Sequence, residues 1–339
     1  MNTIFKRLIT LAIAINTMAN LNISYASECE GINSTTIIEK SGTYNWDLFA
    51  DSINDLGRCF NKEQFFDVFN EEYITLLKTA GTQGNASTLH ILGLIKYFGL
   101  DGDKNHQSAH HWFSQSAELK YARAQYFLGI MHGQGKGTVK DQRQASNWFL
   151  LAAEQGHAKA QVNLAYHYMN GKGIERNPEK SIFWLTKAAE QDNPLAYESL
   201  CTINLNQENY IAAHKYCLLA AGKNIASSTH LLGTLYSLGL GVNVDDEQAY
   251  RYYLKAAQLG HYQAQLGLGG IYRDGVGTEQ NYLECYIWWS IAGKKRSADK
   301  YSLSSDEYDE LLSTCRSHLS EKERLIAQSR IDQQLKQND

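Results

Sequence analysis

A pair formed by leucine and a small residue recurs at regular intervals through most of this 339-residue chain. Its copies are Leu92-Gly93, Leu128-Gly129, Leu164-Ala165, Leu200-Cys201, Leu232-Gly233 and Leu268-Gly269, at spacings of 36, 36, 36, 32 and 36 residues. Further small-residue pairs keep the same register downstream: Ala152-Ala153, Ala188-Ala189, Ala220-Ala221, Ala256-Ala257 and Ala292-Gly293. Self-similarity of this kind predicts an all-α solenoid of stacked helical hairpins, in which the small residues let neighbouring helices approach closely.

A Gly-x-Gly turn follows the first helical stretch of four repeats. The four copies are Gly135-Lys-Gly137, Gly171-Lys-Gly173, Gly239-Leu-Gly241 and Gly275-Val-Gly277. A glycine-rich turn that opens a helix is also the form of a phosphate-binding loop. A phosphate site is needed once, whereas this turn is made four times at one repeat position. We therefore interpret it as the connection between two antiparallel helices.

Polar residues suited to capping occupy one position directly before each of five predicted second helices. They are Asn105, Asp141, Asn177, Asp245 and Asn281. Aromatic residues recur at two further positions: Tyr168, Tyr236 and Tyr272 in first helices, and Trp112, Trp148, Trp184, Tyr252 and Trp288 in second helices. Aromatic side chains at helical spacing predict a packed interior rather than a ligand pocket.

The pattern in residues 226–261, ASSTHLLGTLYSLGLGVNVDDEQAYRYYLKAAQLGH, resembles the Sel1-like repeat, a relative of the tetratricopeptide repeat. We divide the chain into six such repeats, at 86–121, 122–157, 158–193, 194–225, 226–261 and 262–297. The fourth departs from the pattern, because NLNQENY replaces the Gly-x-Gly turn and four residues are missing. The resemblance implies a right-handed α-solenoid with a helical C-terminal cap.

Both ends of the chain lie outside these repeats. Lys6 and Arg7 precede a short apolar stretch and Ser24-Tyr25-Ala26 suits cleavage, so we interpret residues 1–26 as a signal peptide. The other segments are an irregular leader at 27–49, a degenerate N-terminal capping repeat at 50–85 and a helical cap at 298–339. This organisation predicts export to a bacterial periplasm, or secretion, with no membrane span in the mature chain.

Six cysteines lie in the predicted mature chain, and an even number in an exported protein favours disulfides. We favour the bridge Cys201 to Cys217, which would staple the weakened fourth hairpin. Pairing in chain order would add Cys29 to Cys59 and Cys285 to Cys315, the latter pinning the C-terminal cap to the last repeat. Buried free thiols are the alternative for some of the six.

Catalytic motifs are mostly missing, since the chain holds neither G-x-S-x-G nor H-E-x-x-H. Ser297-Ala-Asp-Lys300 matches the S-x-x-K motif of penicillin-interacting enzymes, but the accompanying S-D-N is absent. Lys40-Ser-Gly42 resembles the third motif of those enzymes and lies in the wrong order. We therefore predict a protein that is not an enzyme and needs no cofactor, with a peptidoglycan- or β-lactam-related enzyme as a weaker alternative.

Three histidines cluster at the start of one predicted second helix. His106 and His110 share a face at i, i+4 spacing, with His111 beside them, and such a face could hold a metal. No acidic or cysteine ligand accompanies them in the sequence, so we interpret them as a solvated helix face and predict no metal site. The formal charge of −4 does not indicate the basic surface that nucleic-acid binding requires, so we predict no nucleic-acid partner.

The resemblance implies that the first helices line a concave groove, where proteins of this kind bind partners. By analogy, the fifth, ninth and twelfth positions of each repeat face that groove. They supply His90, Leu94, Tyr97, Tyr126, Ile130, Val162, Tyr166, Met169, Glu198, His230 and Arg273. Exposed aromatic, Met, His and Arg side chains suit an interface hot spot, and the alternative for about half of the set is core packing between repeats.

The resulting functional prediction is an exported, non-catalytic scaffold or adaptor that binds another protein through its concave face. The partner would be an envelope, secreted or toxin protein. The alternative also involves binding but belongs to a different functional class: an immunity-type inhibitor that occludes a periplasmic toxin.

Overall fold

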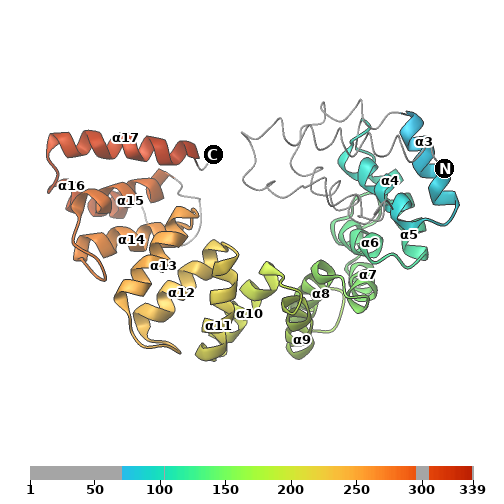
Figure 1. The fold of residues 1–339 in the computed structure, drawn as a ribbon, viewed down its shortest axis with the longest axis horizontal. Coiled ribbons are helices and arrows are strands. Elements are labelled where there is room, and N and C mark those ends of the chain that lie inside the picture. The colour runs from blue at the N-terminus through green and yellow to red at the C-terminus, as the bar shows by residue number, and fades with distance from the viewer. Residues whose placement is uncertain (1–70, 103, 295–304, 338–339) are drawn as a thin grey trace, which may run out of the picture. The chain divides into compact units, whose positions relative to one another are not determined.

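The computed structural model describes residues 71–102, 104–294 and 305–337, and every regular element in these ranges is an α-helix (Figure 1). The chain divides into two compact units, residues 1–187 and 188–339. Several predictions lie outside the described residues: the signal peptide, the leader, the Cys29–Cys59 pair, most of the capping repeat, Ser297, Lys300 and Lys40-Ser-Gly42.

The described part of unit 1 is a stack of antiparallel helix pairs that follows helix α3. Its elements are α3 (Glu71–Thr82), α4 (Ala86–Phe98), α5 (His106–Glu118), α6 (Ala122–Gln134), α7 (Gln142–Glu154), α8 (Ala158–Asn170) and α9 (Pro178–Ala189), whose last two residues cross the boundary. From α3 to α8 each helix packs against the next one in the chain. The pairs α4/α5, α6/α7 and α8/α9 occupy the first three predicted repeats.

Unit 2 continues the same pattern. Its elements are α10 (Pro194–Asn206), α11 (Tyr210–Gly222), α12 (Ala226–Leu238), α13 (Asp246–Gln258), α14 (Tyr262–Asp274), α15 (Tyr282–Lys294), α16 (Ser305–Arg316) and α17 (Glu321–Gln337). Both α16 and α17 pack on α15, and an Arg330–Glu284 ion pair joins α17 to α15. The prediction of an all-α solenoid of helical hairpins, closed by C-terminal helices, is confirmed.

The Leu-small pairs let an aromatic ring enter between the two helices of a hairpin. A Cβ added at Gly129 would lie 2.5 Å from the ring of Phe149, and one at Gly269 would lie 2.3 Å from Trp289. In the fourth repeat, Cys201 and Cys217 occupy the equivalent pair of positions and form a disulfide. The covalent bond therefore takes the place of the contact between glycine and aromatic ring that is made in the repeats whose Leu-small pair ends in glycine.

The second glycine of each Gly-x-Gly turn touches the repeat before it. At Gly173, φ is +66° and an added Cβ would lie 2.1 Å from the backbone carbonyl of Gln142, at the start of α7. Gly277 makes the same approach to Asp246, with 2.0 Å to its carbonyl oxygen. The turn is thus a contact between successive repeats, which agrees with its interpretation as architecture.

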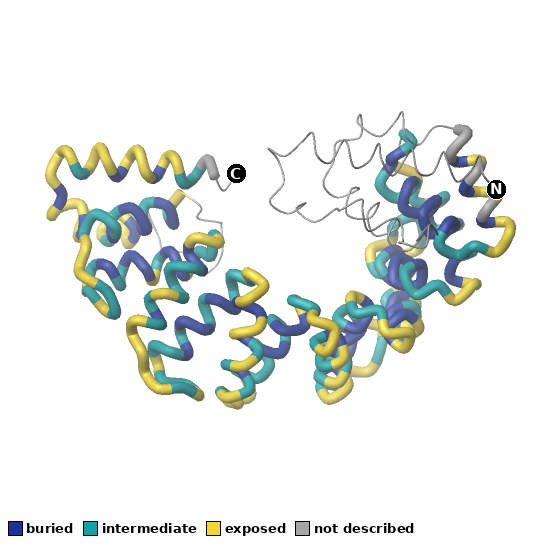
Figure 2. The backbone as a smooth tube through the Cα atoms, in the orientation of Figure 1, coloured by how far each residue is buried: buried dark blue, intermediate teal, exposed yellow. Residues whose placement is uncertain are grey.

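The predicted caps and core positions are confirmed. Side-chain oxygens of Asn105, Asp141, Asn177, Asp245 and Asn281 each accept a hydrogen bond from a backbone N–H in the first turn of the following helix. The recurring aromatic residues are buried or half-buried, and buried residues follow the facing sides of the helices (Figure 2).

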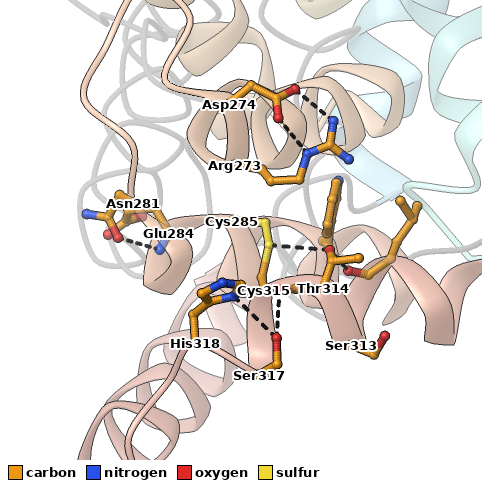
Figure 3. Close-up of a disulfide and its surroundings, with 12 residues drawn as sticks. Arg273, Asp274, Asn281, Glu284, Cys285, Ser313, Thr314, Cys315, Ser317 and His318 are labelled. Atoms are coloured by element: carbon orange, nitrogen blue, oxygen red, sulfur yellow. Dashed lines mark hydrogen bonds and ion pairs between the residues drawn. A yellow bond between two sulfur atoms is a disulfide. The ribbon is translucent and has the colours of Figure 1, made fainter.

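Two of the three predicted disulfides lie within the described residues. Cys201 and Cys217 join α10 to α11, with their Cα atoms 5.0 Å apart. Cys285 and Cys315 join α15 to α16, with Cα atoms 6.2 Å apart (Figure 3). All four side chains are buried. The alternative of free thiols is therefore wrong for these four residues.

Candidate partner-binding surface

The candidate surface is the outward side of the first helices, α4, α6 and α8 in unit 1 and α10, α12 and α14 in unit 2; we call it the first-helix face. The structure places the eleven predicted residues of this face in three groups, which differ in exposure. They are buried core residues, partly exposed residues engaged within the chain, and one well-exposed tyrosine.

His90, Leu94 and Tyr126 belong to the core, and their prediction as surface residues is corrected. His90 packs between aromatic rings, 5.2 Å from Phe113 and 5.4 Å from Phe127 between ring centroids. Tyr126 is 8% exposed. Bulky aromatic neighbours at these repeat positions close over the side chains, so a partner cannot reach them while the repeats stay stacked.

Burial also decides the charge of the histidines in this core. It holds the pKa of His90 well below its usual range, with Arg123 and His157 adding to the effect. Burial lowers the pKa of His157 to about 4, helped by Arg123 and Lys159. Both imidazoles are therefore neutral near pH 7 and serve packing: the His157 ring lies 4.7 Å from that of Tyr126.

Tyr166 is the best exposed of the predicted residues, at 50%. The Nζ atom of Lys172, in the middle of the Gly-Lys-Gly turn, donates a hydrogen bond of 2.8 Å to the Tyr166 hydroxyl and lies 4.6 Å from the ring centroid. Lys136 contacts Tyr97 in the same manner, at 3.3 Å from its hydroxyl and 5.4 Å from its ring. Unit 1 therefore presents two pairs of tyrosine and lysine on its first-helix face.

The lysines of these pairs were missed by the sequence reasoning, which treated the Gly-x-Gly turns only as connections. The signal was present, since two of the four turns carry lysine between the glycines and the other two carry leucine or valine. A first-helix tyrosine beside such a lysine combines a π face, a hydroxyl group and a cation, the chemistry that is enriched at interface hot spots.

In unit 2 the predicted residues are largely engaged within the chain. Arg273 forms a bidentate ion pair with Asp274, with both N–O distances 2.7 Å (Figure 3). Its guanidinium lies 5.7 Å from the centroid of the Trp289 ring. The Glu198 carboxylate accepts a hydrogen bond from Ser227. His230 is partly exposed as well, as are Ile130, Val162 and Met169 in unit 1. None of these side chains in unit 2 matches the exposure of Tyr166.

Exposed apolar residues occur on the second helices, which the sequence reasoning did not predict as a binding surface. They are Phe183 on α9, and Ile211, Leu218 and Leu219 on α11. Ile211 is 77% exposed, where the preceding repeats carry Gln107, Arg143 and Glu179. The fourth hairpin thus differs from the others in its turn, its disulfide and its outer face.

The histidines predicted as one solvated helix face have separate surroundings. The His106 ring packs on Tyr97, with centroids 5.1 Å apart, and His111 lies beside Trp112. His110 instead faces His132 of α6. Over the described ranges, no group of three or more His, Cys, Asp or Glu residues is arranged to hold a metal.

The chain matches a family model described as Sel1 repeat. The matched residues are 86–121, 122–157, 158–193, 226–261 and 263–297, together more than half of the chain. Residues 194–225, the hairpin with the disulfide and without the Gly-x-Gly turn, lie outside the matched ranges. No curated protein sequence matches the chain.

The solved structures that are similar to this fold include two Sel1-type proteins. A protective antigen of uropathogenic Escherichia coli that displays an SLR fold has a TM-score of 0.69 at 26% identity, covering 85% of this chain and 64% of the antigen. A Sel1 repeat protein from Oxalobacter formigenes has a TM-score of 0.59 at 27% identity, covering 75% of this chain and 98% of that protein. The chain therefore spans less than two thirds of the length of the Escherichia coli antigen.

Proposed function

Because the chain belongs to the Sel1 repeat family, whose members are generally protein-interaction scaffolds, we propose that it is an exported, non-catalytic adaptor. It binds another protein through the first-helix face of unit 1. The observation that carries this proposal is the exposed pair of Tyr166 and Lys172, built jointly by a first helix and a Gly-Lys-Gly turn. An exposed tyrosine held in one orientation loses little entropy on binding.

Export is supported by two independent features. The four cysteines of the described residues form two disulfides, which persist in oxidising compartments such as the bacterial periplasm. The sequence Lys6-Arg7 followed by an apolar stretch has the form of a signal peptide. Among the described helices, none is long and apolar enough to cross a membrane. On the basis of the disulfides and the signal-peptide pattern, we place the adaptor in the periplasm or outside the cell.

Affinity capture with residues 27–339 tests the proposal, with captured proteins identified by mass spectrometry. The informative variant is Tyr166→Ala/Lys172→Ala, since both side chains are exposed and the core is left intact. Tyr126→Ala is unsuitable because it would leave a cavity in the core and destabilise the fold. Phe183→Ala is the matched control, since this ring is equally exposed, at 53%, but lies on a second helix.

A partner retained by the wild type and by Phe183→Ala, and lost by the Tyr166/Lys172 variant, is the expected result. A toxin among the partners lost in this way would identify the adaptor as an immunity-type inhibitor. Loss of the partner in Phe183→Ala alone would move the binding site to the second helices and refute the proposal.

A further inference from the structure

Two imidazoles from successive repeats face one another at the surface of unit 1. The Nε2 atom of His110, on α5, lies 3.4 Å from the Nε2 atom of His132, on α6. Their ring centroids are 5.3 Å apart and the ring planes are inclined by 75°. Both residues are partly exposed. The two nitrogen atoms therefore face one another between two partly exposed residues.

The same register position carries a different pair in later repeats. His214 and Tyr236 are also separated by 22 residues, and the histidine Nε2 lies 3.2 Å from the tyrosine hydroxyl. Tyr250 and Tyr272 follow the same spacing, with their hydroxyl oxygens 2.8 Å apart. In both pairs a hydroxyl group completes a hydrogen bond between repeats. The pair in unit 1 has no hydroxyl, and 3.4 Å is long for a hydrogen bond donated by nitrogen.

The separation of the two nitrogens fits a shared metal ion. Imidazole nitrogen binds Zn²⁺ at about 2.0–2.1 Å, and tetrahedral coordination then holds two such nitrogens about 3.3–3.4 Å apart. The observed 3.4 Å matches this value without movement of either ring. We propose that His110 and His132 form a two-imidazole binding site for a divalent transition-metal cation of the Zn²⁺ and Cu²⁺ class.

The electrostatics of the pair suit this role. Burial lowers the pKa of His110, and His132 and His111 lower it further. Burial also lowers the pKa of His132. The Asp141 carboxylate and a backbone hydrogen bond with Val139 raise this pKa, but burial is the larger effect. A lowered pKa favours the uncharged imidazole, which is the form that binds metals. The Asp141 carboxylate contributes a field that favours a cation.

The surroundings also indicate the coordination number and the class of metal. The Nδ1 atom of His110 lies 3.5 Å from the Ser114 hydroxyl, which leaves Nε2 available to a metal. Since no third His, Cys, Asp or Glu completes a cluster within the described part of the chain, water fills the other positions. Imidazole ligands select Zn²⁺, Cu²⁺ and Ni²⁺ over Mg²⁺ and Ca²⁺, which prefer oxygen.

The register comparison supplies the decisive variant. His132→Tyr should convert the pair into the one formed by His214 and Tyr236, which preserves the contact between repeats and removes a metal ligand. Zn²⁺ binding is measured by titration calorimetry at pH 7 on residues 27–339 without a histidine tag, with circular dichroism to verify folding. His111→Gln is the matched control, because it removes a neighbouring imidazole that does not face the pair.

Wild type and His111→Gln should bind one Zn²⁺ per chain, and His132→Tyr should lose affinity by at least about tenfold. His110→Gln should show the same loss and serves as the second variant if His132→Tyr does not fold. Equal binding by wild type and both of these variants would overturn the inference. Absence of Zn²⁺ binding to the wild type, with the same result for Cu²⁺, would reduce the pair to a contact between repeats.

Discussion

Replacing the second glycine of a Gly-x-Gly turn should destabilise the stack far more than replacing the first. Gly171 and Gly173 flank Lys172, and both have φ of +66°. An alanine in this left-handed conformation costs about 1–2 kcal/mol at either position. A Cβ at residue 171 would find its nearest atom, in Arg176, at 3.4 Å, which is ordinary contact. Gly171→Ala should therefore lose only the backbone contribution.

Gly173→Ala adds a collision with the preceding repeat. Its Cβ would lie 2.1 Å from the carbonyl of Gln142 and 2.4 Å from the backbone nitrogen of Arg143. Carbon contacts are normally about 3.5–4.0 Å, so the turn and the start of α7 must separate by about an ångström or more. Overpacking of this kind costs about 1–3 kcal/mol in addition to the backbone term. The expected total is about 2–5 kcal/mol.

Urea unfolding followed by far-UV circular dichroism measures both variants under identical conditions. The difference between them isolates the contact between repeats, because the left-handed backbone term is common to both. Stacked repeats can unfold in steps, so the comparison uses the midpoint of the transition that the substitution moves. An equal shift of that midpoint for Gly171→Ala and Gly173→Ala would refute the reasoning, since the close approach to α7 would then carry no energetic weight.

Two further predictions concern the disulfide of unit 2 and the buried histidines of unit 1. Cys201→Ser/Cys217→Ser should destabilise unit 2 by about 3 kcal/mol, the value for a closed loop of this length. Urea unfolding should show this difference from the wild type without reductant and lose most of it with reductant, because reduction also opens Cys285–Cys315 in both proteins. Burial lowers the pKa of His157 in the folded chain to about 4, so below about pH 6.5 the unfolded chain takes up a proton that the folded chain does not. The free energy of unfolding should therefore fall as the pH drops from 6.5 towards 4, by about 3 kcal/mol at most. His157→Asn should reduce that slope and keep the helix cap, because Asn193 caps α10 at the same repeat position; an unchanged slope would contradict the assignment.

Much of the fold follows from the repeat period alone. Helix pairs, their caps and the position of the small residues are decided by neighbours within about one repeat, which the sequence displays directly. The disulfides Cys201–Cys217 and Cys285–Cys315 followed in the same way, since each joins helices that adjoin in the stack. The Gly-x-Gly turn was also assigned correctly, because a feature repeated four times in register is architecture.

The exposure of individual side chains was decided only by the tertiary structure. His90 and Tyr126 occupy the same repeat position as the partly exposed Val162, yet aromatic neighbours bury them. The repeat pattern gives the direction in which a side chain leaves its helix. Whether that side chain reaches solvent depends on the size of residues that adjoining helices contribute.

The pairing of His110 with His132 has the same origin. Sequence analysis grouped His110 with His106 and His111, its neighbours along α5, and found no metal ligand beside them. The structure brings His132 from the next repeat to 3.4 Å. The repeat period determined that successive hairpins stack, but only the tertiary structure shows which two side chains come into contact. Such a contact depends on the crossing angle of two helices and on the rotamers packed between them.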